Sequence, residues 1–139
     1  MKKLLIIFLI LISPTMMANE TEIVAFLNSH LKLLEQQDVE GSINNLHSKG
    51  KNRAKSIKDL RMKLPGMKFK YKIMESSYIG KDEEFHYIRY KQRTFFNEQW
   101  QKMAKVKGIE MDCITILGIE DGKYKIFDTY LFSQTKLKD

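Results

Sequence analysis

A carboxylate near the C-terminus is the side chain in this sequence best suited to chemistry. Asp128 lies in the stretch IFDTYLF, among aromatic and aliphatic neighbours. A carboxylate in apolar surroundings has a raised pKa and can then transfer protons near neutral pH. Side chains that could serve as its partners are His30, His86, Tyr90 and Tyr130. The candidate catalytic set is therefore Asp128, His30 and Tyr130.

These residues also have a simpler interpretation. His30 lies on the apolar stripe of a predicted helix, where a histidine is more often a hydrogen-bonded core residue than a catalyst. His86 comes at the start of a predicted strand, close to a turn, where solvent can reach it. Nothing in the sequence brings either histidine to Asp128. Catalysis is for this reason the alternative interpretation and not the main one.

Cysteine and histidine usage indicates neither a disulfide nor a metal site. Cys113 is the single cysteine, so no intramolecular disulfide can form. It lies in the apolar segment MDCITIL, where a buried thiol acts as a small hydrophobic side chain. The three histidines are scattered and do not have the spacing of a zinc site. We expect no cofactor and no metal.

Two predicted strands carry a regular series of cations. In KFKYKI and HYIRYKQR, cations alternate with apolar residues, as in half-buried strands. If a turn near residues 80–83 joins the strands, six cations share one face with few acids nearby, namely Lys68, Lys70, Lys72, Arg89, Lys91 and Arg93. Such a face favours an anionic partner, or acids from elsewhere in the fold.

A solvated cationic face has a simpler purpose, because lysines on an edge strand prevent aggregation. Binding of nucleic acid would need exposed aromatic residues among the cations. Here Phe69, Tyr71, Ile88 and Tyr90 fall on the opposite face. Nucleic acid is therefore not among the expected partners.

The N-terminus has the pattern of a secretory signal peptide. Two lysines precede the apolar run Leu4–Ile12, Ser13-Pro14 interrupts it, and Ala18 offers a small residue for cleavage. The run is too short for a helix across a hydrocarbon core of about 30 Å. We expect residues 1–18 to be removed and residues 19–139 to form one exported domain, periplasmic or secreted, without a transmembrane span. An uncleaved anchor is the alternative. The formal net charge of +7 favours contact with anionic surfaces or acidic proteins.

Helical periodicity dominates the first third of the remaining chain. Asn19 and Glu22 have the spacing of a capping box and predict a long helix over residues 20–37. Further helices are expected over residues 38–47 and 52–64, the last of which ends at a Pro-Gly pair.

The remainder is predicted as four strands, with no helix between the second and the third. Asp121-Gly122 joins the last two strands, and this dipeptide is a strong hairpin signal. A two-residue turn there places Thr115 opposite Asp128 and Cys113 opposite Tyr130. A hydrogen-bonded pair of threonine and carboxylate would satisfy Asp128 without any catalytic role.

Helices followed by a curved antiparallel sheet make an α+β arrangement. With its long first helix, the strand HYIRYKQRTFF and above all the hairpin GIEDGKYKIFDTYLF, the chain resembles the nuclear transport factor 2-like superfamily, also described as cystatin-like. The resemblance implies three N-terminal helices packed on a curved four-stranded antiparallel sheet, which together form a cone with an apolar pocket. Some members are isomerases or cyclases that use pocket Asp, His or Tyr side chains. Many others are exported small domains that bind ligands or partners.

We interpret the chain as an exported binding domain without catalytic activity. The expected partners are a small apolar or amphipathic ligand in the cone, an anionic surface or acidic protein on the cationic strands, and a second copy of the chain. The last follows from a sheet that is apolar on both faces. One alternative is an acid–base enzyme of the isomerase or cyclase type that uses Asp128. Another is a secreted inhibitor or adaptor that presents its sheet to another protein.

Overall fold

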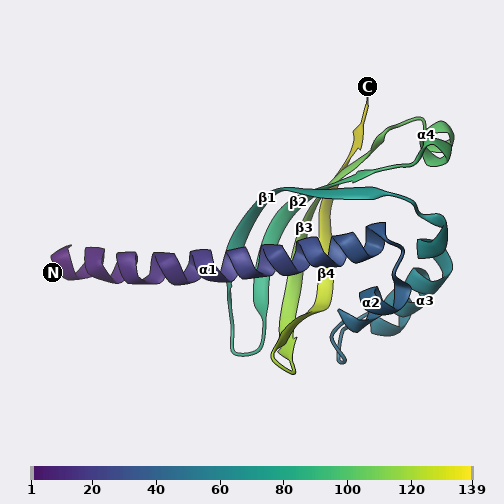
Figure 1. Ribbon diagram of the computed structural model, residues 1–139. Coiled ribbons are helices and arrows are strands. Elements are labelled where there is room, and N and C mark those ends of the chain that lie inside the picture. Colours follow the sequence, from purple (N-terminus) through teal and green to yellow (C-terminus); the bar gives the residue numbers. More distant parts are fainter. Residues whose placement is uncertain (1, 139) are drawn as a thin grey trace.

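A computed structural model describes the backbone of residues 2–138 and the side chains of residues 19–138 (Figure 1). The helices are α1 (Lys2–Glu35), α2 (Val39–Asn44), α3 (Arg53–Lys63), the 3-10 helix η1 (Leu64–Gly66) and α4 (Glu98–Ala104). The strands are β1 (Lys70–Lys81), β2 (His86–Phe95), β3 (Gly108–Glu120) and β4 (Lys123–Leu137). The described part of the chain therefore has the predicted α+β order, with three α-helices before a four-stranded sheet.

The sheet is antiparallel throughout, and its strands lie in the order β1-β2-β3-β4. Figure 1 shows the strands bending strongly, with α1 lying across one face. The helices α2 and α3 lie beyond the C-terminal end of α1, on the side of β4 (Figure 1). The bend and the helices together make the predicted cone.

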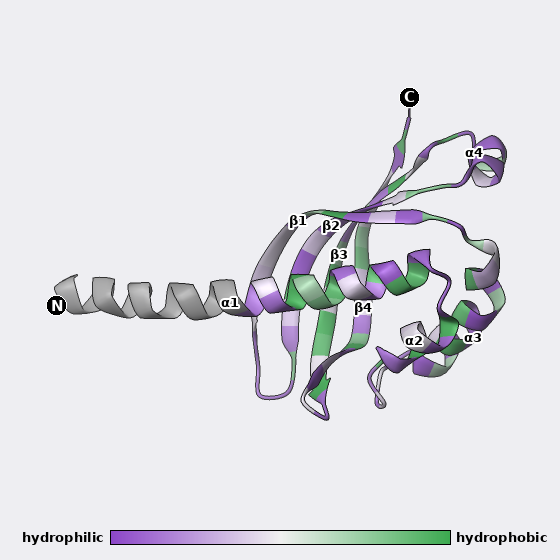
Figure 2. Ribbon diagram, viewed as in Figure 1, coloured by the Kyte–Doolittle hydropathy of each residue, from purple (hydrophilic) through white to green (hydrophobic). Residues whose placement is uncertain are grey.

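The core lies between α1 and the concave face of the sheet. Ile23 and Leu27 are four residues apart, so both point from one side of α1 toward the sheet. They pack with Ile88 and Leu117, and of these four residues only Leu27 retains any exposed surface. Cys113 is buried in the same cluster, as predicted. In Figure 2, β3 carries a long hydrophobic stretch where it passes under α1.

In the full-length chain, α1 does not start at Asn19. The α1 backbone begins at Lys2 and runs through Asn19, which consequently is an interior residue and not an N-cap. The signal-peptide prediction concerns residues 1–18, whose side chains lie outside those that the structure describes, and it stays a prediction. Within residues 19–138, no helix is both long enough and apolar enough to cross a bilayer.

The final hairpin turns where the sequence predicts. Asp121 and Gly122 have positive φ angles of 53° and 73°, which a two-residue turn of this class requires. Next to the turn, Leu117 faces Ile126 in the predicted register. Near the turn, the local sequence was sufficient to predict the register of β3 and β4, because the two turn residues determine which residues pair.

Farther from the turn, the predicted register of β4 is wrong. A bulge at Phe127 shifts the pairing by one residue, so that Asp128 faces Ile116 and Thr115 faces Thr129. The expected pair of Thr115 and Asp128 is absent. The same shift brings Leu131, and not Tyr130, opposite Cys113, and a second bulge at Phe132 then places Ser133 opposite Asp112.

Contacts from the segment between α2 and α3 account for the first bulge. Ile126 donates its backbone N–H to the carbonyl of Asn45 at 2.8 Å, and its own carbonyl accepts from His47 N at 2.8 Å. The carbonyl of Phe127 accepts from Lys51 N at 3.3 Å. These residues form hydrogen bonds with the backbone of β4 on the side away from β3. We infer that these bonds produce the bulge, where the register of pairing between β3 and β4 shifts by one residue.

The helix α4 corrects the expectation that none separates the second and third strands. Asn97 accepts the N–H of Trp100 at 3.0 Å and caps the helix, and Lys105 ends it with a φ of 56°. The Trp100 ring packs against Phe69, with ring centroids 5.4 Å apart. An asparagine followed by good helix formers is the signal that could have identified α4.

Candidate ligand-binding site

An open cavity of about 560 Å³ lies between α1, α3 and β4. Its volume is in the range of small-molecule sites, about 300–1,000 Å³. Apolar side chains form much of the wall, namely Leu34, Leu46, Leu60, Leu64, Met67, Ile126 and Phe127. The polar residues in the wall are His30, Asn52, Arg53, Lys55, Ser56, Asp59, Lys63, Tyr71, Asp128 and Thr129.

Helix periodicity brings these residues to the cavity. His30 and Leu34 are one turn apart on α1 and so share a side of that helix. Arg53, Ser56 and Leu60 have the corresponding spacing on α3. The bulge in β4 supplies Asp128 from the opposite wall.

His30 is a neutral, hydrogen-bonded residue of the cavity wall. Its Nδ1 accepts from the Asn45 side-chain amide at 3.1 Å, which places the ring proton on Nε2. Burial lowers the pKa of His30 from 6.5 to about 4. At neutral pH the ring therefore carries no charge and has no proton to give as an imidazolium acid.

The cavity brings together two of the three predicted catalytic residues. Asp128 lines it with His30, but among the described side chains no hydrogen bond joins the two. Asp128 Oδ1 instead accepts from the backbone N–H of Thr129 at 2.9 Å. Tyr130 is not in the cavity wall; it is 45% exposed, with Lys51 Nζ 5.8 Å from its ring centroid.

The other two proposed partners of Asp128 are buried elsewhere. His86 Nδ1 and the Tyr78 hydroxyl are 2.8 Å apart, and burial lowers the pKa of His86. The expectation that solvent reaches His86 is wrong, because the rings of Tyr78 and Tyr124 pack against it. The Tyr90 hydroxyl bonds to Thr115 at 2.9 Å, and burial raises the pKa of Tyr90 to about 12.

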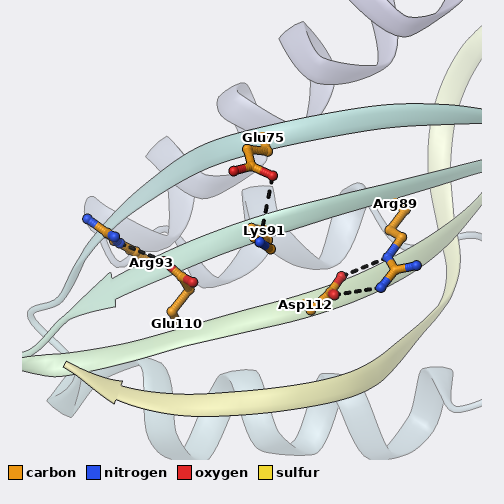
Figure 3. Close-up of polar contacts among 6 residues, drawn as sticks. All are labelled: Glu75, Arg89, Lys91, Arg93, Glu110 and Asp112. Carbon is orange, nitrogen blue, oxygen red and sulfur yellow. Dashed lines mark hydrogen bonds and ion pairs between the residues drawn. The ribbon is translucent and has the colours of Figure 1, made fainter.

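The predicted cationic strands carry paired charges on the sheet face opposite α1 (Figure 3). Three ion pairs join their cations to acids of β1 and β3: Arg89 to Asp112 at 2.7 Å, Arg93 to Glu110 at 2.7 Å and Lys91 to Glu75 at 3.7 Å. The expectation of few nearby acids is wrong, because the alternation of β3 places its two acids on the same face as the arginines.

The remaining predicted cations are exposed. Lys68 precedes β1, and Lys72 faces Arg93 across the β1–β2 ladder. Lys70 lies at the start of β1, opposite Phe95. Among residues 19–138, none of these three lysines forms an ion pair. Lys70 and Lys72 therefore share the face of the three paired cations, and of the six residues only these three lysines offer unpaired charge.

No protein-family model and no curated protein matches the amino-acid sequence. Solved structures do superpose on the fold. The β subunit of benzoate 1,2-dioxygenase from Burkholderia mallei superposes with a TM-score of 0.64 and 12% identity, over 80% of this chain and 87% of that chain. A putative calcium/calmodulin dependent protein kinase II association domain from Xanthomonas campestris gives a TM-score of 0.65 and 15% identity, over 79% and 84%. The chain has a nuclear transport factor 2-like fold.

A third structure, Bd1075 from Bdellovibrio bacteriovorus, gives a TM-score of 0.65 at 12% identity. The match covers 81% of this chain but 40% of that one, so the shared unit is less than half of the Bdellovibrio protein. At these identities the likeness shows the fold alone.

Within this nuclear transport factor 2-like fold, α3 contributes a polar wall that was not predicted from the sequence. Arg53, Lys55 and Ser56 lie in the first turn of α3 and line the cavity. Arg53 and Ser56 lie seven and four residues before the apolar Leu60, and this spacing was the available signal, since such residues share a helix face. In the part of the chain with described side chains, no group of His, Cys, Asp and Glu could hold a metal ion.

Proposed function

We propose that this domain acts after export as a binding protein for a small amphipathic molecule, which enters the cavity between α1, α3 and β4. The supporting observation is the cavity itself. It combines apolar side chains with polar groups from α1, α3, β1 and β4. A few placed polar groups on an apolar surface are typical of small-molecule sites.

Binding accounts for the polar residues better than acid–base catalysis does. His30 has its Nδ1 engaged with Asn45 and is neutral, and Asp128 bonds its own backbone neighbour. Tyr130 lies outside the cavity wall. A general acid–base set needs its members within hydrogen-bond reach of one another or of a bound substrate. These three residues form no such relay.

An uncharged fluorescent probe tests the cavity. N-phenyl-1-naphthylamine is expected to bind the wild-type protein with increased fluorescence, because the apolar wall excludes water from it. Leu60→Trp places a larger ring in the cavity and is expected to weaken binding about tenfold or more, a change of about 1.4 kcal/mol. A fluorescence titration measures both affinities.

Lys58→Trp is the matched control, because Lys58 is exposed on α3 and does not line the cavity. This variant should bind the probe like the wild type. Equal affinities for wild type and Leu60→Trp, or no binding to the wild type, would refute a ligand site in this cavity.

Self-association is a second candidate function, and it rests on the exposed part of β4. Tyr130 and Phe132 are 45% and 59% exposed on an edge strand, and Phe132 lies beside Arg89 on the sheet face opposite α1. The ion pair of Arg89 and Asp112 beside Phe132 leaves little unpaired charge there to repel an identical face. One of the structural neighbours is described as an association domain. We propose that a second copy of the chain covers this face.

Phe132→Glu tests the self-association without disturbing the monomer. The new carboxylate would lie near Arg89, whose guanidinium is 5.4 Å from the Phe132 ring centroid, and it would put charge into the proposed interface. Sedimentation is expected to give a dimer for the wild type and a monomer for the variant. Met103→Glu alters an equally exposed apolar residue of α4 and should leave the dimer intact. A monomeric wild type would rule out this interface.

A further inference from the structure

One buried polar atom of the cavity wall has no partner. Arg53 Nε is inaccessible to solvent, and it is the only such side-chain nitrogen or oxygen without a hydrogen bond among residues 19–138. Arg53 is the first residue of α3, and its side chain lines the cavity. A buried guanidinium N–H left unpaired is costly, since it has lost its bonds to water. If the guanidinium turns toward the cavity, an acceptor supplied by a ligand would remove that cost.

The charges around the cavity leave an excess of positive charge. Lys63 is paired with Asp59 at 3.3 Å, so these two residues neutralise each other. Arg53 and Lys55 take part in no ion pair within the described residues. Asp128 is the one remaining acid in the wall. Among the described residues, the cavity wall therefore carries two unpaired cations, Arg53 and Lys55, and one unpaired carboxylate, Asp128.

The N-terminus of α3 adds partial positive charge to the same region of the cavity. Asn52 precedes the helix but makes no side-chain hydrogen bond to its first turn. The first N–H groups of a helix without a side-chain cap carry partial positive charge and favour an anion. Asn52, Arg53 and Lys55 all line the cavity, so an anion there would meet the guanidinium and the helix terminus together.

We propose that the ligand is a monocarboxylate with an aliphatic chain, and this inference rests on the proposed ligand-binding function. On binding, the guanidinium of Arg53 turns toward the cavity, and the carboxylate accepts from its N–H groups at the first turn of α3. Guanidinium and carboxylate form directional, charge-assisted hydrogen bonds, which favours this head group at an arginine. Its chain lies against the apolar wall formed by Leu34, Leu60 and Phe127.

Competition against bound N-phenyl-1-naphthylamine tests the inference, with sodium decanoate and decanol as competitors of equal chain length. In the wild-type protein, decanoate is expected to displace the probe at a concentration about tenfold lower than decanol, because it alone carries the anion. Arg53→Gln should abolish this preference and leave displacement by decanol unchanged. Arg53→Lys, which keeps the charge without the planar guanidinium, should retain part of it.

The outcomes separate the two proposals. Equal displacement by decanoate and decanol in the wild type overturns the carboxylate inference and leaves the ligand site standing. If Arg53→Gln weakens the binding of decanoate and of decanol equally, the carboxylate inference is also overturned, since Arg53 would then affect only the shape of the cavity. Failure of the probe and of decanol to bind the wild type overturns the ligand site and the inference with it. Lys58→Gln, an exposed change on the same helix, should match the wild type in every arm.

Discussion

Gly108→Ala is expected to destabilise the protein by about 3 kcal/mol, at the upper end of typical overpacking costs. Gly108 is buried at the start of β3 and faces Phe95 of β2. A Cβ atom at this position would lie 2.0 Å from the carbonyl oxygen of Thr94. That oxygen belongs to the backbone of the neighbouring strand and cannot rotate away. The two strands would have to separate, with loss of ladder hydrogen bonds.

Thermal unfolding monitored by circular dichroism measures the effect. Because ~1 kcal/mol corresponds to several degrees in a domain of this size, the midpoint should fall by about 10 °C or more. Gly66→Ala is the matched control, since a Cβ there would meet no atom within 4 Å. Its midpoint should stay close to that of the wild type. Similar melting curves for Gly108→Ala and the control would contradict the close approach of β2 and β3.

His30 is expected to make the protein less stable as the pH falls from 7 to 5. Its pKa is lowered by burial to about 4 in the folded state, against 6.5 in the unfolded chain. As the pH falls below 6.5, the unfolded chain gains a proton that the folded protein does not bind, so unfolding becomes more favourable. At 1.36 kcal/mol per pKa unit, the loss from this residue is about 2 kcal/mol by pH 5.

Urea unfolding of the wild type and His30→Gln at pH 7 and pH 5 isolates this contribution. Glutamine can still accept the Asn45 hydrogen bond but does not titrate. The wild type should lose about 2 kcal/mol more than the variant over this interval. His86 also has a lowered pKa and contributes equally to both proteins, so it cancels in the comparison. Parallel losses in the two proteins would show that His30 is not buried in the folded state.

The proposed site and the proposed interface use opposite sides of the sheet. The cavity lies on the side of α1 and α3, whereas the exposed ring of Phe132 lies beside Arg89 on the face opposite α1. A ligand and a second copy of the chain could therefore bind at the same time. Variants in one region serve as additional controls for the other.

The sequence by itself determined the features that depend on near neighbours. The Asp-Gly turn follows from its two residues, and the order of the first three helices and the four strands follows from apolar periodicity. The burial of Cys113 follows from its apolar segment. Each of these is encoded within a few residues, so no contact with a distant segment is needed to predict it.

The tertiary structure alone decided where the charged and reactive groups lie. Asp128 lost its predicted partner Thr115 because residues 45–51 dock against β4 and produce a bulge there. Arg89 gained Asp112 because β3 lies next to β2 in the sheet. The cavity at Arg53 exists because α1, α3 and β4 meet there. These contacts join residues far apart in the chain, and local patterns carry no information on which distant segments will meet.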